Sequence, residues 1–198
     1  MSMKKRVFFA INLSNPIKET LKIFFDQVKT IENIRWEPIE KLHVTLLFLG
    51  YVEEKQIESL RIIIKDTAQQ VVPFTLSLVP KLSAFPSLSA PRILWLPVIS
   101  DGNQLEKIKM LLEGQLEKYH IPFDKKQVTM HVTLGRVKRF EKENIGQIQQ
   151  ILEETMAVSS WSPKKPLSFV ASGKTLFEST LSPRGSKYTV IQYEDFRH

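Results

Sequence analysis

Apolar residues along the chain fall into two patterns, short continuous runs and longer stretches with an apolar position every three or four residues. Short runs bounded by turn residues are typical of buried strands, and the longer pattern is typical of amphipathic helices. The expected strands cover residues 5–13, 42–50, 73–82, 91–99, 129–137, 166–177 and 187–196. The expected helices cover residues 14–28, 53–70, 100–119 and 142–156.

The order of these elements repeats along the chain. The series strand, helix, strand, helix, strand occurs twice, with Ser14 matching Ser100 and His43 matching His131 at an offset of about 90 residues. No Gly/Ser-rich linker divides the chain, and the best candidate seam is the Pro- and Ser-containing stretch 85–92.

We therefore expect one bilobal domain over residues 1–198 that arose by internal duplication. The first repeat covers about residues 4–84, the second about 91–181, and a closing strand covers about 187–196. The expected fold class is α+β, with two pseudo-symmetric lobes, each an antiparallel-rich sheet covered by helices, and a cleft between them.

Composition excludes several classes of protein. The chain has no cysteine, so disulfide frameworks, thiol nucleophiles and cysteine-bound metals are excluded, and a reducing cytoplasm is expected. The sequence shows no secretory signal pattern and no apolar stretch of about 18 residues, so no membrane partner is expected. The net charge of +7 has two interpretations, an ordinary basic surface or an anionic ligand such as nucleic acid.

The tetrapeptide His-Val-Thr-Leu occurs at His43 and again at His131. Residues i and i+2 of a strand point to the same face, so His43 and Thr45 share one face, opposite Val44, Leu46 and Phe48. His131 and Thr133 likewise share a face. One such pair is usually a half-buried structural pair, but core packing has no need to repeat a polar pair, whereas a site shared between two lobes needs both.

Two such pairs suit in-line displacement at phosphorus. One imidazole acts as general base on the attacking side and the other as general acid on the leaving side, because histidine titrates near neutral pH. The hydroxyls of Thr45 and Thr133 bind the phosphate oxygens. No metal or cofactor is expected, since a zinc site needs a third ligand and His120 and His198 are expected on the surface.

Other residues have two interpretations each. Trp36 and Phe85 are candidates for stacking a terminal base, and lobe packing is the alternative. Arg136 is a candidate phosphate ligand, although strand alternation directs it away from His131 unless a bulge or the strand end at Gly135 turns it back. Arg92 is a candidate for a phosphate contact, with a place beside a strand as the alternative. Arg184 and Lys187 are candidates for gating the cleft, with a solvated loop as the alternative.

The chain resembles the two-histidine (2H) phosphoesterases, and most closely the RNA 2′,3′-cyclic phosphodiesterases of the ThpR/LigT type. The resemblance rests, in order, on "RVFFAINL", "IRWEPIEKLHVTLLFLG", "AFP", "PRILWL", "MHVTLGR" and "LFESTLSPRGSKYTV". One departure is Met130, where the family usually has proline.

The resemblance implies metal-independent hydrolysis of RNA 2′,3′-cyclic phosphate ends to 2′-phosphates. It implies that His43 is the proton donor and His131 the proton acceptor. Alternatives are another small cyclic phosphate, a 2′–5′ oligonucleotide including 2′–5′ RNA ligation, or a non-catalytic module that binds RNA ends. The expected partner is RNA or a nucleotide with a cyclic phosphate end, bound by a cytoplasmic monomer.

Overall fold

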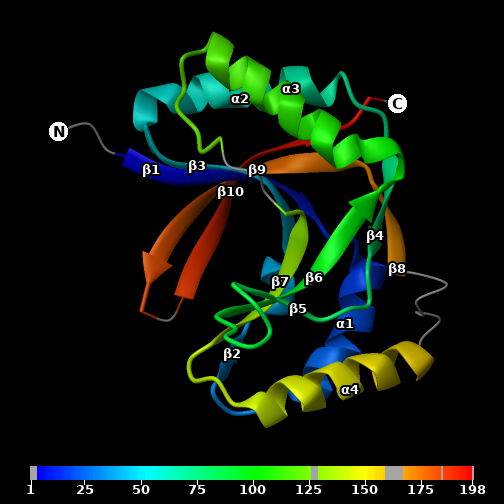
Figure 1. Cartoon of the computed structure of the whole chain (residues 1–198). Coiled ribbons are helices and arrows are strands. Elements are labelled where there is room, and N and C mark those ends of the chain that lie inside the picture. The colour runs from blue at the N-terminus through cyan, green and yellow to red at the C-terminus, as the bar shows by residue number, and fades with distance from the viewer. Residues whose placement is uncertain (1–3, 126–128, 159–166, 184, 198) are drawn as a thin grey trace.

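The computed structural model describes residues 4–125, 129–158, 167–183 and 185–197 (Figure 1). Its strands are β1 (Lys4–Asn12), β2 (Ile34–Trp36), β3 (His43–Glu53), β4 (Phe74–Leu78), β5 (Ser83–Phe85), β6 (Ile93–Ser100), β7 (His131–Val137), β8 (Leu167–Ala171), β9 (Gly173–Ser182) and β10 (Gly185–Asp195). Its α-helices are α1 (Asn15–Val28), α2 (Ile57–Ala68), α3 (Gln104–Lys118) and α4 (Lys142–Val158). Short 3-10 helices cover Ile39–Lys41, Glu54–Gln56 and Asp101–Asn103.

The predicted helices are all present, and the α+β class is confirmed. The apolar stripe expected on the first helix is buried, because α1 packs Ile17, Leu21, Phe24, Phe25 and Val28 into the core. The predicted strand 166–177 is divided into β8 and β9. Strands β2 and β5 were not predicted, because three residues are too few to show a period.

The strands form a single curled sheet in which every pairing among the described residues is antiparallel. The strand order is β10-β9-β1-β3-β7-β6-β4-β8, with β2 added to β7 and β5 added to β6. Strands β3 and β7 therefore meet in the middle of the sheet. They pair through Val44 and Val132, which are the second residues of the two His-Val-Thr-Leu motifs.

Each lobe contains elements from both sequence repeats. Strands β1 and β3 of the first repeat continue into β9 from the second, under a layer formed by α2 and α3. Strands β6 and β7 of the second repeat continue into β4 from the first, and α1 packs beside α4. Figure 1 shows the two helix layers at opposite ends of the molecule. The repeats have thus exchanged one helix and one strand.

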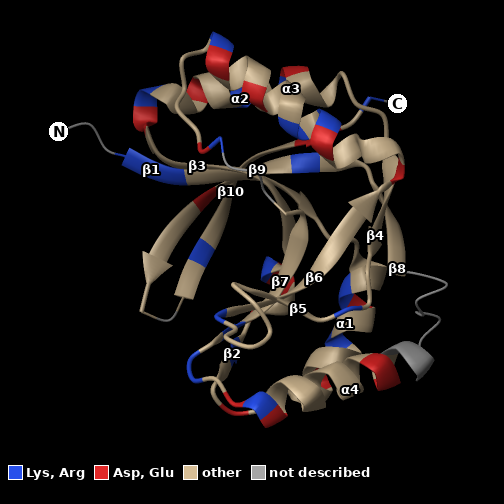
Figure 2. Cartoon of the chain, viewed as in Figure 1, with Lys and Arg blue, Asp and Glu red and all other residues tan. Residues whose placement is uncertain are grey.

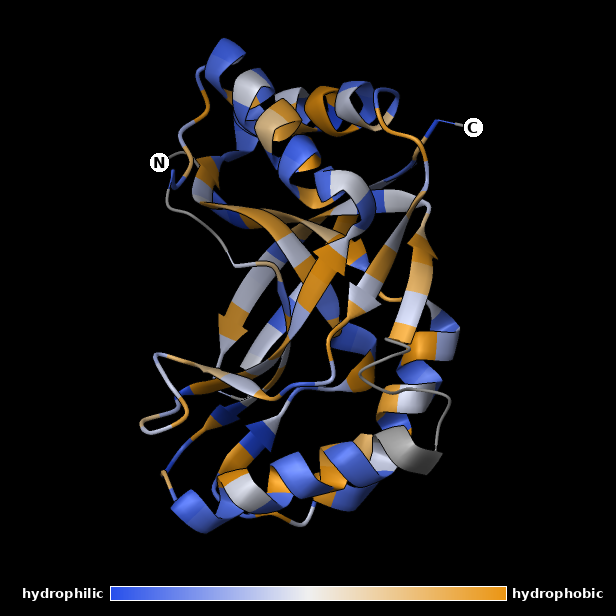
Figure 3. Ribbon diagram, turned by 45° about the vertical axis from the view of Figure 1, so that its right-hand side comes forward, coloured by the Kyte–Doolittle hydropathy of each residue, from blue (hydrophilic) through white to orange (hydrophobic). Residues whose placement is uncertain are grey.

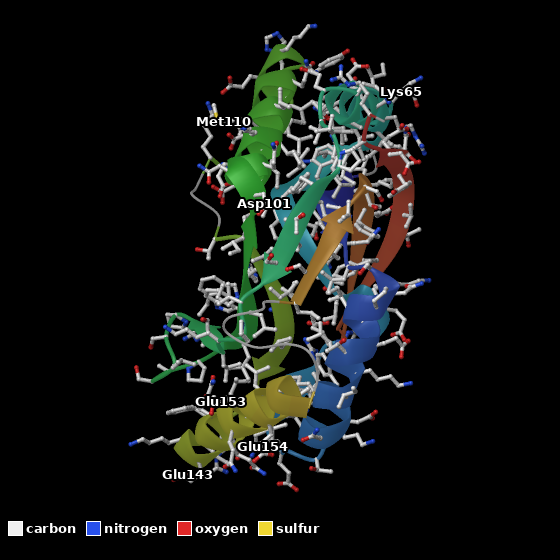
Figure 4. The ribbon with its side chains drawn as sticks, turned by 90° about the vertical axis from the view of Figure 1, so that its right-hand side faces the viewer. Lys65, Asp101, Met110, Glu143, Glu153 and Glu154 are labelled. Carbon is white, nitrogen blue, oxygen red and sulfur yellow. The ribbon has the colours of Figure 1, made fainter. Side chains whose placement is uncertain are left out.

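The core lies between the sheet and these helix layers. Figure 3 shows apolar residues along the strands and on the sheet-facing sides of the helices, and Figure 2 shows charged residues over the outer helix surfaces. The labelled side chains Lys65, Met110 and Glu143 in Figure 4 are exposed on those surfaces. The buried face of α3 consists of Leu105, Ile108, Leu112 and Leu116.

One lysine lies inside this core. Lys174 of β9 is 0% exposed, and its Nζ has no hydrogen-bond partner among the described residues. The ammonium lies 5.7 Å from the centre of the Phe196 ring. Burial lowers the pKa of Lys174 to about 7, because an apolar environment disfavours the charged form, while nearby Glu194 acts in the opposite direction.

Candidate active site

The pairing of β3 with β7 brings the two repeated motifs together. Because Val44 pairs with Val132 in an antiparallel register, His43 lies across from Thr133, and Thr45 lies across from His131. The alternate residues Val44, Leu46, Val132 and Leu134 are fully buried on the opposite face, as predicted. The four polar side chains consequently face the same side of the sheet.

These side chains open into one cavity of about 230 Å³. His43, Thr45, His131 and Thr133 all line it, so the structure brings together the four residues that the motif predicted. The other lining residues are Glu37, Lys41, Phe48, Phe85, Ile93, Arg136 and Tyr188. Since β3 and β7 come from different repeats, the cavity lies on the approximate two-fold axis of the duplicated sheet.

Each imidazole is oriented by a hydrogen bond to the backbone carbonyl two residues earlier in the chain. His43 Nδ1 donates to the carbonyl oxygen of Lys41 at 2.7 Å, and His131 Nδ1 donates to that of Thr129 at 2.7 Å. A carbonyl only accepts, so each Nδ1 carries a proton and each Nε2 is the nitrogen free to exchange one. Nε2 of His43 lies 3.1 Å from the hydroxyl oxygen of Thr45.

Aromatic rings surround each imidazole. The ring of His43 lies 5.0 Å from Phe8 and 5.3 Å from Tyr188, and the ring of His131 lies 5.2 Å from Phe85 (centroid distances). Burial among these rings is the main cause that lowers the pKa of both histidines. The charge of His131 further lowers the pKa of His43, and the charge of Arg136 further lowers that of His131, while the carbonyl hydrogen bonds oppose both shifts.

A bulge in each motif strand turns one later residue into the cavity. Along β7, Thr133 pairs with Trp95 and Gly135 with Leu94, so Leu134 is an extra residue. Simple strand alternation would direct Arg136 to the core side. Because Arg136 follows the bulge, it lines the cavity instead, which is the position expected if a bulge turned it back toward His131.

The equivalent bulge in β3 corrects one expectation. Thr45 pairs with Ala10 and Leu47 with Phe9, so Leu46 is the extra residue. Phe48 was expected on the core face with Val44. The bulge reverses the alternation, and Phe48 is instead 40% exposed and lines the cavity. Phe48 occupies in the first repeat the position that Arg136 occupies in the second.

Three polar residues of the cavity were not found from the sequence. Glu37 accepts a hydrogen bond from Nε of Arg136 at 3.3 Å and so fixes that guanidinium beside the histidines. Lys41 Nζ donates to the carbonyl oxygen of Ser186 at 2.8 Å, and Tyr188 lies edge-on to His43. Lys41 stands two positions before the motif, but nothing in the sequence alone indicates that β10 brings Tyr188 to the cavity.

The two aromatic candidates have different positions. Phe85 lines the cavity and stacks on Trp95 at 4.7 Å. Trp36 does not line it, because its ring packs against Phe24 and Phe25 of α1, which is the packing alternative. A Cβ added at Gly135 would lie 3.0 Å from the Trp36 ring, so a glycine at 135 lets β2 approach β7 this closely.

The remaining candidates lie away from the described cavity lining. Arg92 and Lys187 are exposed and do not line it, and Arg184 and His198 fall outside the described residues. His120 lies at a separate surface hollow beyond the end of α3. Within residues 4–125, 129–158, 167–183 and 185–197, no group of three or more His, Cys, Asp or Glu side chains is placed to hold a metal ion.

A duplicated antiparallel sheet that presents two histidine–threonine pairs to one cavity defines a two-histidine phosphoesterase. Residues 11–95 and 97–188 match the model of the family described as LigT like phosphoesterase, and each segment contains one motif. The chain therefore belongs to the LigT-like phosphoesterase family, as the sequence resemblance predicted. It is an enzyme of the phosphoesterase class.

Relatives match this chain over most of its length. The RNA 2′,3′-cyclic phosphodiesterase of Archaeoglobus fulgidus is 27% identical over 173 residues, which make up 82% of this chain and 95% of that protein. The protein of the same name from Methanocaldococcus jannaschii is 28% identical and covers 94% of this chain and 98% of its own. The crystal structure of TT0787 from Thermus thermophilus shares the fold, with a TM-score of 0.76, 23% identity and coverage of 97% and 98%.

Among the described helices, none combines the length and the apolar character needed to cross a membrane.

Proposed function

We propose that this protein hydrolyses 2′,3′-cyclic phosphate ends of RNA and leaves a 2′-phosphate. The observation that carries the proposal is the convergence of His43, Thr45, His131 and Thr133 on one cavity at the meeting of β3 and β7. The names of the relatives from A. fulgidus and M. jannaschii support the choice of substrate.

In the proposed reaction, His131 is the general base. Its Nε2 takes a proton from a water molecule whose oxygen attacks phosphorus, while the bond from phosphorus to O3′ breaks on the opposite side. Nε2 of His43 gives its proton to O3′. One P–O bond forms and one breaks, and the products are a 2′-phosphate monoester and a free 3′-hydroxyl. Proton exchange with solvent then restores both imidazoles.

The surrounding groups hold the phosphate and its charge. The hydroxyls of Thr45 and Thr133 donate to the non-bridging oxygens, where negative charge develops, and Arg136 adds a fixed positive charge. Low pKa values suit the pair, because a neutral His131 is a ready base. The bound phosphate anion favours the imidazolium that His43 needs as an acid.

The test is incubation with nucleoside 2′,3′-cyclic phosphates and with an RNA that carries the same end, followed by identification of the hydroxyl that keeps the phosphate. The 2′-phosphate is expected, at a rate that excess EDTA leaves unchanged, since histidine and threonine side chains supply every group that the proposed reaction needs. A 3′-phosphate product would contradict the roles of the two histidines. Turnover of small cyclic phosphates but not of the RNA end would favour the alternative of another small cyclic phosphate as substrate. Binding of the RNA end without turnover would favour the alternative of a non-catalytic module.

We further propose that the enzyme acts as a monomer in the cytoplasm, where the absence of cysteine is an ordinary feature. Phe85 is proposed to contact a base of the substrate, because its ring lies in the cavity wall next to His131.

A further inference from the structure

A second cavity of about 300 Å³ adjoins the first. Phe48, Arg136 and Tyr188 line both cavities, and the second adds the side chains of Arg6 and Arg35. We call the second cavity the arginine groove. Its described lining includes three arginines and no Asp or Glu, so it forms a concave, positively charged extension of the active site.

Among the described residues, the contacts of Arg6 leave most of its donors available. Arg6 uses one Nη1–H on the hydroxyl of Ser179 at 2.9 Å, and its guanidinium lies 5.7 Å from the centre of the Phe48 ring. A guanidinium has five N–H donors, in a planar fork that suits phosphate oxygens. Arg35 extends toward the turn between β9 and β10, where its guanidinium carbon is 3.7 Å from a Cβ built at Gly185.

The groove opens from the His43 side of the active site. Tyr188, which lines both cavities, lies edge-on to His43 with ring centres 5.3 Å apart. Phe85, which contacts His131, lines only the active cavity. Tyr188 therefore connects the groove to the His43 side of the active cavity, while Arg136 of β7 forms the rest of the polar border between the two cavities.

The geometry of in-line displacement places the ribose of the substrate on the His43 side of the phosphorus. If His43 protonates O3′, the ribose that carries O3′ must lie on the His43 side of the phosphorus, and the attacking water must lie on the His131 side. The 5′ oxygen of that ribose, and the RNA chain attached to it, then leave the cavity past Phe48 and Tyr188. The next phosphodiester along the chain meets the arginine groove.

We propose that Arg6 and Arg35 bind the phosphodiester on the 5′ side of the terminal nucleotide, so that the enzyme prefers oligonucleotide ends to mononucleotides. This inference rests on the proposed function. It assigns the substrate class as an RNA chain with at least one internal phosphate. Arg136, at the border of the two cavities, serves the cyclic phosphate and is not needed for the preference.

The experiment compares uridine 2′,3′-cyclic phosphate with the uridine dinucleotide and trinucleotide that have the same end. Each longer substrate adds one internal phosphate and one nucleoside, and the arginine variants separate the contribution of the phosphate from that of the nucleoside. For the wild type, kcat/KM should rise roughly 10- to 100-fold from mononucleotide to dinucleotide, the range of one charge-assisted phosphate contact. It should rise much less from dinucleotide to trinucleotide, since the groove holds one phosphate.

Arg35→Gln is the main variant, because Arg35 lines the groove and not the active cavity. It should lose most of the dinucleotide preference and keep its rate on the mononucleotide. Arg35→Lys should restore part of the preference by restoring the charge. Arg6→Gln should behave like Arg35→Gln, and the mononucleotide rate reveals any disturbance of the β1–β9 contact. Arg197→Gln, in the exposed C-terminal segment, is the matched control for loss of one charge.

Salt gives a second readout. The logarithm of kcat/KM for the dinucleotide should fall with the logarithm of salt concentration, and Arg35→Gln should make that slope shallower by about 0.7, as for one phosphate contact to a single strand. Equal rates on all three substrates, or equal losses of Arg35→Gln on mononucleotide and dinucleotide, would overturn the proposal.

Failure of the proposed function has a different signature, because the wild type would then turn over none of the three substrates. In that case, the affinities of the corresponding 2′-phosphates, measured by calorimetry, test whether the groove binds an internal phosphate. Tighter binding of the dinucleotide by the wild type, lost in Arg35→Gln, supports the groove, and equal binding of mononucleotide and dinucleotide refutes it.

Discussion

Each histidine of the site is held by a backbone carbonyl two residues earlier in the chain, at 2.7 Å in both cases. This local arrangement fixes Nδ1 as the protonated nitrogen and leaves Nε2 for chemistry. The accepting carbonyls belong to the residues that lead into each strand. The two lobes therefore use the same geometry with different sequences, Lys41-Leu42 before His43 and Thr129-Met130 before His131.

Replacing either histidine should abolish proton transfer and preserve the fold. His43→Ala and His131→Ala are each expected to lower kcat by about 10²- to 10⁴-fold on a 2′,3′-cyclic phosphate. His120→Ala, which changes a histidine outside the cavity, is the control and should keep full activity. A folded variant of His43 or His131 with near-wild-type turnover would refute the assignment.

The lowered pKa values predict an acid-shifted pH profile. One imidazole must be protonated and the other neutral, so kcat/KM follows a bell centred between the two free-enzyme pKa values. Burial lowers both pKa values below 6.5, and the centre is therefore expected below pH 6.5. The profile of kcat should lie at higher pH, because the bound anion raises the pKa of its neighbours. Initial rates between about pH 4 and 9 give both curves, and a kcat/KM that still rises above about pH 8 contradicts the pair.

Lys174 carries a separate pH dependence, of stability rather than activity. Its pKa is about 7 in the folded protein against an ordinary value of 10.5, so between these values the unfolded chain binds more protons. The free energy of unfolding should therefore rise with pH from about 7 to 10.5 and carry the full cost of the buried charge below pH 7.

Lys174→Met should remove that dependence. We expect stabilisation of about 1–4 kcal/mol at and below pH 7, because an apolar side chain of similar volume replaces a buried ammonium that has no hydrogen-bond partner among the described residues. The gain should disappear near pH 10.5. Urea unfolding of both proteins at several pH values measures it, and a variant that is less stable than the wild type at about pH 6 would show that the charge is compensated.

At the scale of elements, the bulges in β3 and β7 mark the limit of what strand alternation can predict. The pattern placed His43, Thr45, His131 and Thr133 correctly on one face, since these residues precede the bulges. It misplaced Phe48, which follows one. A bulge depends on pairing with the neighbouring strand, and Leu46 and Leu134 do not differ in type from ordinary strand residues.

The fold itself was largely predictable, because each helix and long strand has its own apolar period. The third strands of the repeats were predicted as elements, but their partners were not. Hydrogen bonds between strands distant in the chain leave no periodic signal, so Tyr188 of β10 and the arginines of the groove could not be placed from the sequence.

Gly135 links the bulge to the packing of β2. A Cβ at this position would lie 3.0 Å from the Trp36 ring, 3.1 Å from Ile34 and 3.2 Å from the carbonyl oxygen of Arg35. Gly135→Ala is therefore expected to push β2 away from β7 and to lower the free energy of unfolding by about 1–3 kcal/mol.

The matched control for this change is Gly146→Ala in α4, where a Cβ meets nothing within 4 Å. There the same substitution should stabilise the protein by about 0.5–1 kcal/mol, because alanine is the better helix residue. Thermal and urea unfolding of both variants provide the comparison. Equal effects of the two substitutions would show that β2 accommodates the added methyl group.

At the scale of the whole molecule, the approximate two-fold symmetry does not extend to the residues that line the rest of the cavity. The two histidines, their carbonyl partners and the two bulges repeat, but the residues beyond the bulges differ, Phe48 in one repeat and Arg136 in the other. An asymmetric substrate needs different lining residues on the two sides of a symmetric pair of histidines. In the proposed reaction, the duplicated motifs provide the two histidines that transfer protons, and residues outside these motifs, Arg6, Arg35 and Phe85, orient the substrate.

The exchange of strands between the repeats has a consequence for biosynthesis. Strand β1 (Lys4–Asn12) is synthesised long before its outer neighbour β9 (Gly173–Ser182). A nascent chain that stops after the first repeat would expose one edge of β1 and would hold β4 without its partner β6. Neither lobe can complete its sheet until β8 and β9 have been synthesised. We therefore expect the two halves to fold as one cooperative unit, with an unpaired edge of β1 that a chaperone can protect in the meantime.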